Sequence, residues 1–319
     1  MFDCSKPAWL CTLFLRENLK CCNVQRCSKT IQIFADDNTL STYANTIERV
    51  VSNLENDSRL AINWFKANHM IANPDKFQAI ILKKNGDDNS DIPLKINGET
   101  IKSENEVVLL GVTIDDKLSF TSHISNICKS AANQLNSIKR LRKHFDQSTK
   151  INMVKTFVLS QFNYCPLVWH FCKPGDTHKM EKLQERTLRF IFNDYCTEYK
   201  DLLSIHGEST LYLNRVRKMA HEVYKAINGN SPKYSKELLR FRPNPSRRPL
   251  DLYIPRVNQV TFGYRSYMFE APSLWNSLPL EIRNAETFPL FKSLMKTWTG
   301  PNCRCMGCKY LEHDGGNED

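Results

Sequence analysis

The spacing of hydrophobic residues changes once along the chain, from a strand period in the first third to a helix period in the rest. Up to residue 115, apolar residues form short runs bounded by turn residues, and the dipeptide Asn97-Gly98 is a strong hairpin signal. One long amphipathic helix is predicted at about 45–68. The predicted strands are 31–33, 77–82, 92–96, 99–102 and 107–114. Strands mixed with one long helix indicate an α+β fold.

From Thr121 onward, hydrophobic residues recur three or four positions apart, as on the buried stripe of an amphipathic helix. Such stripes indicate core packing rather than a cofactor site. The segment 243–262 is rich in proline and arginine and is predicted to be extended. The predicted helices are 121–145, 148–162, 176–193 and 210–228, followed by a pair of short helices between 272 and 298.

The length and charge of the chain limit the class of protein. Its 319 residues suffice for two or three domains with hydrophobic cores. Hydrophobic residues make up 41%, which is typical of globular chains, and the formal net charge is +10. A basic chain favours a polyanionic partner such as RNA or DNA, or an anionic membrane surface. No apolar run approaches the roughly 18 residues that span a bilayer, so no membrane partner is expected.

Much of the positive charge lies in one stretch. Between Asn214 and Arg248 there are ten Lys or Arg residues against two acidic ones, Glu222 and Glu237. Two interpretations stay open for this stretch, a solvated helix face and a phosphate-binding surface.

The N-terminus and the cysteines indicate the compartment. The apolar stretch 8–15 runs straight into Arg16 and Glu17 without a small-residue cleavage site, so it does not resemble a signal peptide. We expect a cytoplasmic or nuclear protein that is not secreted, in which the 12 cysteines stay reduced. The spacing of Cys303, Cys305 and Cys308 is not that of a standard zinc finger, and free thiols are expected there rather than zinc.

Two adjacent carboxylates, Asp36 and Asp37, fall where a hairpin should turn after the strand 31–33. Tight hairpin turns prefer Asn-Gly or Asp-Gly, because both central residues need a positive φ. Side by side, two carboxylates also repel unless a cation lies between them or water screens them. The pair is therefore either a solvated turn or a site of metal chemistry.

The surrounding residues favour the second interpretation. Phe34-Ala35-Asp36-Asp37 resembles the F/Y-A-D-D box of reverse transcriptases from non-LTR retrotransposons of the jockey-like and CR1-like group. Further segments resemble that family in the same order along the chain, and the likeness covers about 30–298. These segments are Asn73-Pro74-Asp75-Lys76, Leu110-Gly111-Val112-Thr113-Ile114-Asp115, Tyr164-Cys165-Pro166-Leu167-Val168-Trp169, Leu183-Gln184-Glu185-Arg186 with Asn193-Asp194-Tyr195, and Trp275-Asn276-Ser277-Leu278-Pro279.

The resemblance implies an RNA-directed DNA polymerase that joins nucleotides to a DNA primer on an RNA template. Two Mg²⁺ ions about 4 Å apart would activate the primer 3′-hydroxyl and stabilise the leaving pyrophosphate. Asp36 and Asp37 would be the catalytic residues and metal ligands, with Asp36 the more direct ligand. By the same resemblance Lys76 would lie near the incoming nucleotide, and Leu110 and Gly111 would form the primer grip. The basic helix 121–145 would track the duplex backbone through Lys129, Lys139, Arg140 and Lys143.

The same resemblance implies a division into domains. A partial palm would be followed by a mostly helical thumb and a helical C-terminal region. The expected boundaries are 1–29 for a degenerate leader, 30–118 for the partial palm, 119–200 for the thumb, 201–300 for a basic helical C-terminal region and 301–319 for a disordered tail that contains cysteines.

One part of the family pattern is missing. The family takes a third metal-binding carboxylate from an earlier palm strand, and a G-x-P-Q-G-type segment precedes its F-A-D-D box. Only 35 residues precede Asp36, and none of them forms such a segment. Asp3 resembles the aspartate of the family's D-x-S-K strand, with a chance match as the alternative. We therefore expect a truncated polymerase that is inactive as this chain, because an incomplete palm cannot hold template and nucleotide in place. The alternatives are a non-catalytic RNA- or DNA-binding module and a remnant of the element without function.

Overall fold

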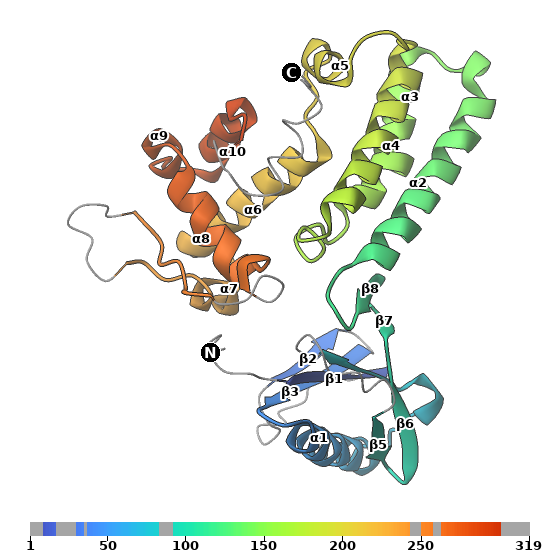
Figure 1. Cartoon of the computed structure of the whole chain (residues 1–319), viewed down its shortest axis with the longest axis vertical. Coiled ribbons are helices and arrows are strands. Elements are labelled where there is room, and N and C mark those ends of the chain that lie inside the picture. The colour runs from blue at the N-terminus through green and yellow to red at the C-terminus, as the bar shows by residue number, and fades with distance from the viewer. Residues whose placement is uncertain are drawn as a thin grey trace, which may run out of the picture. The chain divides into compact units, whose positions relative to one another are not determined.

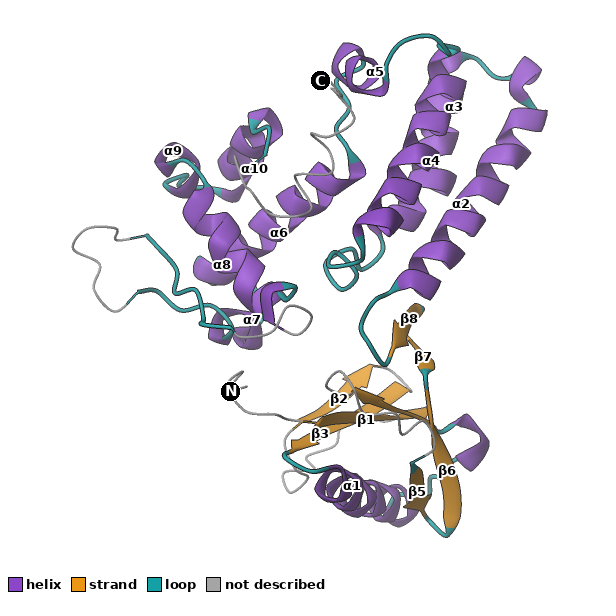
Figure 2. Cartoon of the chain, viewed as in Figure 1, coloured by secondary structure: helices purple, strands orange, loops and turns teal. Residues whose placement is uncertain are grey.

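The structure is a computed structural model that describes residues 9–16, 30–34, 37–82, 92–242, 250–257 and 263–300. The chain forms two compact units, Met1–His123 and Ile124–Asp319 (Figure 1). Among the described residues, the named strands all lie in the first unit and most helices lie in the second (Figure 2). The predicted mixture of strands and helices is confirmed.

The first unit contains a six-stranded sheet in the order β2-β3-β1-β4-β6-β5. Strand β1 pairs antiparallel with both β3 and β4, and β2 and β3 form an antiparallel hairpin. β4 and β6 pair in parallel, and β5 and β6 form the hairpin predicted at Asn97-Gly98. The strands are β1 (Trp9–Arg16), β2 (Thr30–Phe34), β3 (Asp37–Ala44), β4 (Gln78–Leu82), β5 (Pro93–Ile96) and β6 (Glu99–Glu104).

Helix α1 (Ile47–Ala67) packs against β1, β3 and β5 and covers one face of the sheet (Figure 1). It begins after Thr46, whose hydroxyl accepts a hydrogen bond from the Arg49 amide. Its inner stripe includes Val50, Leu54 and Phe65, all almost fully buried against the sheet. Burying each such side chain stabilises the fold by about 1.5–3 kcal/mol. The helix predicted at 45–68 is confirmed.

A second, two-stranded sheet follows, formed by β7 (Glu106–Leu109) and β8 (Val112–Asp115). The prediction of one strand over 107–114 is therefore wrong. The chain reverses at Leu110-Gly111, where both residues have positive φ, +47° and +80°. Two such residues match the twist of a hairpin, and the turn brings the apolar residues of the run opposite one another.

The second unit is helical, and α2 begins shortly before it. The core forms where α6 packs against α8 and α10, with Tyr224 stacked on Phe291 at 4.4 Å between ring centroids. The helices are α2 (Thr121–Arg140), α3 (Gln147–Met153), α4 (Pro174–Phe192), α5 (Tyr199–Ile205), α6 (Leu211–Ile227), α7 (Lys233–Glu237), α8 (Tyr267–Ser277), α9 (Leu280–Arg283) and α10 (Phe288–Thr297). The helices predicted at 121–145, 176–193 and 210–228 are confirmed with shifts in their bounds. The helix predicted at 148–162 is an α-helix only to Met153, and it continues as a π-helix (Val154–Val158) and a 3₁₀ helix (Leu159–Asn163). Three helices, α8, α9 and α10, lie where a pair of short helices was predicted, and α5 and α7 are additional. None of the helices described is both long and apolar enough to cross a bilayer.

Candidate nucleic-acid interface

The double-aspartate box lies between the paired strands β2 and β3. Phe34 and Asp37 are register partners, so the hairpin predicted around the box is present. Asp36 lies outside the described residues, and of Asp37 only the backbone is described, as the first residue of β3. The structure therefore describes the strands that flank the box and neither of the two carboxylates on which the metal prediction depends.

Strand β1 is the neighbour of β3 in the sheet, and its residues bear on the missing third carboxylate. Its last residue, Arg16, is the register partner of Asp37. Its sequence, WLCTLFLR, contains no aspartate or glutamate. Strand β1 thus brings a basic residue, and no carboxylate, beside the box.

The residues that could bind a metal ion bear on the two metals considered, Mg²⁺ and zinc. Carboxylate oxygens suit Mg²⁺, but the box and β1 together supply two carboxylates rather than three. Among the side chains that the structure describes, no three His, Cys, Asp or Glu residues come together as a metal site. Cys303, Cys305 and Cys308 lie outside the described residues.

Leu110 and Gly111, the predicted primer grip, form the turn of the β7–β8 hairpin. A left-handed conformation costs a residue such as leucine roughly 1–2 kcal/mol, and strain of this kind is often found at functional sites. The base of the hairpin is held by Asp115, whose carboxylate accepts bonds from the amides of Ser119 (2.9 Å) and Phe120 (2.6 Å). Asp115, the last residue of the motif that begins at Leu110, thus anchors the backbone that follows the hairpin.

His123 fixes the same hairpin from α2. Its Nδ1 accepts a hydrogen bond from the amide of Thr113 in β8, at 3.3 Å. Burial lowers the pKa of His123 below its ordinary 6.5, which favours the neutral ring that can accept this bond. The hairpin is therefore held at both β8 and the following turn.

Lys76 is exposed and ends the short 3₁₀ helix Pro74–Lys76 that leads toward β4. Asn73 begins this turn, and its side-chain oxygen accepts a hydrogen bond from the Asp75 amide at 3.1 Å. The motif Asn73-Pro74-Asp75-Lys76 is therefore a capped turn with its lysine in solvent.

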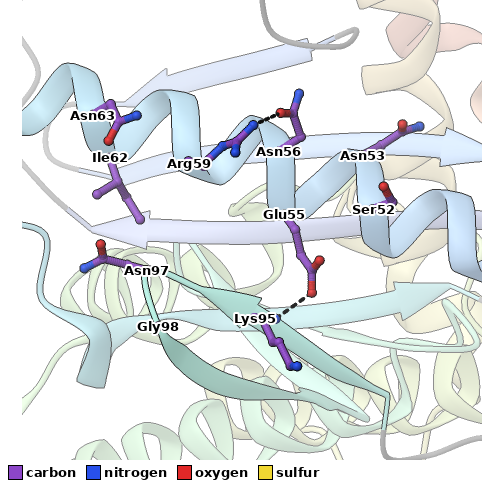
Figure 3. Close-up of a pocket in the computed structure, with 10 residues that line it drawn as sticks. All are labelled: Ser52, Asn53, Glu55, Asn56, Arg59, Ile62, Asn63, Lys95, Asn97 and Gly98. Carbon is purple, nitrogen blue, oxygen red and sulfur yellow. Dashed lines mark hydrogen bonds between the residues drawn. The ribbon is translucent and has the colours of Figure 1, made fainter.

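A cleft of about 770 Å³ opens between α1 and the β5–β6 turn, and none of the predicted site residues lines it (Figure 3). Two hydrogen bonds join polar groups of its lining. Glu55 accepts a hydrogen bond from the Lys95 amide at 2.7 Å, and Arg59 donates to Asn56 at 2.8 Å. The cleft lacks the convergent nucleophile, base or metal ligands that would mark an active site.

The four predicted backbone-binding residues lie along α2 and just beyond it. Lys129 and Arg140 are exposed and eleven residues apart, about three helical turns, so they share a face of α2. Lys139 is half-buried beside Arg140, and Lys143 is exposed in the 3₁₀ turn that follows. Three of the four predicted cations thus lie at or just after the C-terminal end of α2.

The structure adds two cations, Lys150 and Arg186, that are not among the four residues predicted to contact the duplex backbone. Lys150 of α3 and Lys139 each place Nζ 5.8 Å from the ring centroid of Phe190 in α4. Burial lowers the pKa of Lys139, and the positive charge of Arg186 lowers it further. Neither Lys139 nor Arg186 has a carboxylate within ion-pair distance in the part of the chain that the structure describes. We call Lys139, Lys150 and Arg186 the Phe190 cluster.

The basic stretch 214–248 includes the cations of α6, and these make contacts within the protein rather than a solvated or phosphate-binding face. Arg215 is almost fully buried, with its guanidinium 5.2 Å from the ring centroid of Trp169. Arg217 donates to the carbonyl groups of Lys296 and Trp298, at 2.9 and 2.8 Å. Lys218 donates to the Asn163 side chain, and Lys225 pairs with Glu222. These contacts hold the helical unit together, so the charge of α6 does not form a free phosphate-binding face.

Buried polar groups in and just before the motif Leu183-Gln184-Glu185-Arg186 also have structural roles. Gln184 and Glu181 accept hydrogen bonds from the Tyr199 hydroxyl, at 2.9 and 2.8 Å. Both also accept from the Leu211 amide, and Glu181 accepts from the Tyr212 amide at 2.8 Å. These amides begin α6, so α4 supplies the cap of α6. Burial raises the pKa of Glu181 above its ordinary value.

The chain is similar to the RNA-directed DNA polymerase from the mobile element jockey of Drosophila melanogaster, with 24% identity over 164 residues. The similar stretch covers 50% of this chain and 18% of the jockey protein. No protein-family model matches the chain, and no solved structure matches it. The similarity confirms the resemblance to jockey-like reverse transcriptases that the motifs predict.

Proposed function

We propose that this chain is a part of an RNA-directed DNA polymerase of a non-LTR retrotransposon, and that it holds an RNA template paired with a DNA primer. The observation that carries the proposal is the similarity to the jockey polymerase over half of the chain. The β2–β3 hairpin around the double-aspartate box and the strained β7–β8 turn support it. In this proposal residues 30–118 are a partial palm, 119–200 a thumb and 201–300 a basic helical C-terminal region.

Asp36 and Asp37 would supply two carboxylates for Mg²⁺, and the ions would supply charge stabilisation for nucleotidyl transfer. Strand β1 lies where a third carboxylate could stand beside the box, and it offers Arg16 instead. Lys76 would serve the incoming nucleotide, and Leu110 and Gly111 the primer. Because strand β1 carries no acidic residue, we propose that this chain binds template and primer without extending the primer by itself.

The Phe190 cluster is the surface that we propose for the duplex backbone. Like charges that lie close together repel one another. Binding of a polyanion that neutralises them relieves this repulsion, which favours the complex. Arg140 and Lys143 extend the cluster along the end of α2, and Lys129 extends it further along the same helix. Contacts with phosphate groups do not depend on base sequence, as a polymerase requires.

Binding of an RNA–DNA hybrid should weaken steeply with salt. Each neutralised phosphate contributes about 0.9 to the slope of log Kd against log salt concentration, so three to five contacts give a slope of about 2.7–4.5. Fluorescence anisotropy with a labelled hybrid, from 50 to 300 mM KCl, measures this slope. Absent binding, or binding that does not change with salt, would remove the proposed function.

A non-catalytic RNA- or DNA-binding module is the second candidate. The arginine on β1 favours it, because a strand without a carboxylate beside the box suits a chain that binds without catalysis. Both candidates share the Phe190 cluster, and they differ in whether any primer is extended.

A further inference from the structure

We propose that the cleft between α1 and the β5–β6 turn binds the sugar–phosphate backbone of a single nucleic-acid strand. Its volume of about 770 Å³ lies within the range of about 300–1,000 Å³ that is usual for ligand sites. The lining combines cations with carboxamides and a hydroxyl, and none of the ten lining residues is aromatic (Figure 3). Side chains of these kinds contact phosphate and sugar groups, whereas the stacking of bases requires aromatic rings.

One wall of the cleft is a stripe along α1. Its side chains are spaced four, three and four residues apart, so they share a face of the helix. The stripe extends over eleven residues, which is about 16 Å of helix and long enough for a few consecutive nucleotides. All four side chains are exposed, and they are Ser52, Asn56, Arg59 and Asn63.

The opposite wall is the β5–β6 turn, which is joined to α1 at two points. The Lys95 amide donates to the Glu55 carboxylate at 2.7 Å. The Lys66 ammonium donates to the Asn97 side chain at 3.0 Å. Asn97 and Gly98 have positive φ, +52° and +90°, as the tight turn of a hairpin requires. Because these contacts hold the walls in place before a ligand binds, the entropic cost of binding is lowered.

The charge of the cleft favours an anion. Arg59, Lys66 and Lys95 lie in or beside it, and none of them has a carboxylate within ion-pair distance in the part of the chain that the structure describes. Arg59 and Lys66 donate instead to neutral carboxamides, which leaves their charge unbalanced. Glu55 is the one acidic residue in the lining, and one of its oxygens is used by the Lys95 amide.

The hydrogen-bonding groups that remain for a ligand are mostly donors. Asn56 and Asn97 each accept a bond from a cation through Oδ1, at 2.8 and 3.0 Å, so each keeps two N–H donors. The cations and the Ser52 hydroxyl add further donors. A phosphodiester offers acceptors and no donor, whereas the N–H groups of a peptide would need acceptors, of which three are already used. The cleft therefore matches a nucleic-acid backbone better than an acidic peptide.

The cleft can be tested apart from the Phe190 cluster, because the two lie in different units of the chain. The proposal thus goes beyond the proposed function and does not depend on it. The test uses the full chain with Lys139, Lys150 and Arg186 replaced by glutamine, so that the Phe190 cluster does not contribute.

Lysine acetylation followed by mass spectrometry reports on the cleft directly, with and without 20-nucleotide oligo(U) or oligo(dT). A saturating strand should lower the acetylation rate of Lys95 about fivefold or more, because a bound phosphate covers its ammonium group. The acetylation rate of Lys200, which is exposed in α5, should not change. The strand that protects Lys95 at the lower concentration identifies RNA or DNA as the natural ligand.

Substitutions in the same chain measure the affinity of the cleft by fluorescence anisotropy. Arg59→Gln with Lys95→Gln should weaken binding of the strands about tenfold at 100 mM salt, because two phosphate contacts are lost. Arg59→Lys with Lys95→Arg keeps both charges and should retain the affinity. The matched control is Lys173→Gln with Lys200→Gln, which removes two exposed charges elsewhere and should change the affinity less than about twofold.

The proposal is overturned if the oligonucleotides leave the acetylation of Lys95 unchanged, or if the two glutamine pairs weaken binding equally. It is also overturned if the charge-preserving pair binds as weakly as Arg59→Gln with Lys95→Gln. Protection of Lys95 by a poly-glutamate peptide to the same extent would make the cleft a site for acidic peptides and would equally overturn it.

Discussion

Replacing Glu181 by alanine is expected to lower the free energy of unfolding of the helical unit by about 3–5 kcal/mol. The carboxylate accepts hydrogen bonds from the Tyr199 hydroxyl and from the Leu211 and Tyr212 amides. Without it, buried donors at the start of α6 would lose partners, and each such loss costs about 1–3 kcal/mol. The buried guanidinium of Arg215 would also lose a nearby carboxylate.

Urea unfolding followed by circular dichroism measures this loss, with Glu185→Ala as the matched control. Glu185 lies on the same helix, is partly exposed and pairs with Arg189. Removing such a pair should cost less than about 1 kcal/mol. Equal losses for the two substitutions would contradict the capping role of Glu181.

Replacing Lys139, Lys150 and Arg186 together by glutamine is expected to weaken binding of an RNA–DNA hybrid by about 10²-fold at 100 mM salt. Three phosphate contacts would be lost, so the slope of log Kd against log salt should also fall by about 2–3. The three side chains are on the surface or half-buried, and removing their mutual repulsion should not destabilise the fold. Anisotropy with the labelled hybrid measures both quantities.

The control for this triple variant removes the same number of charges elsewhere. Lys155, Lys179 and Lys225 each already pair with a carboxylate, those of Glu208, Asp176 and Glu222. Replacing all three by glutamine should change hybrid affinity much less. If both triple variants weaken binding to the same extent, net charge rather than the Phe190 cluster explains the binding.

The periodic elements were predictable from the sequence because burial on one side imposes a period on each of them. The hairpin at Leu110 was not, since local preference argues against a leucine with positive φ. For the apolar stretch 8–15, most of which forms β1, an internal strand or helix was expected, and the sequence did not decide between them because it gives neither a clear alternation nor a cap. A strand of this kind is specified by the neighbours that it pairs with, β3 and β4.

The roles of polar residues were harder to predict than the elements. Ten cations between 214 and 248 could be counted, but the bonds that Arg217 makes to carbonyls near residue 298 depend on tertiary packing. The same holds for Gln184 and Asn276, whose partners lie more than 20 residues away. Lys150 and Arg186 were missed because three separate elements bring the Phe190 cluster together. The roles of Lys76, Leu110, Gly111 and the two aspartates in catalysis stay predictions.

The most direct test of the central claim is a primer-extension assay with Mg²⁺ on an RNA template annealed to a DNA primer, with binding measured in the same samples. Because β1 offers Arg16 and no carboxylate beside the double-aspartate box, the chain should bind the template–primer and leave the primer at its original length. Extension of the primer that disappears on Asp36→Ala would contradict this account, as would failure to bind the template–primer at all.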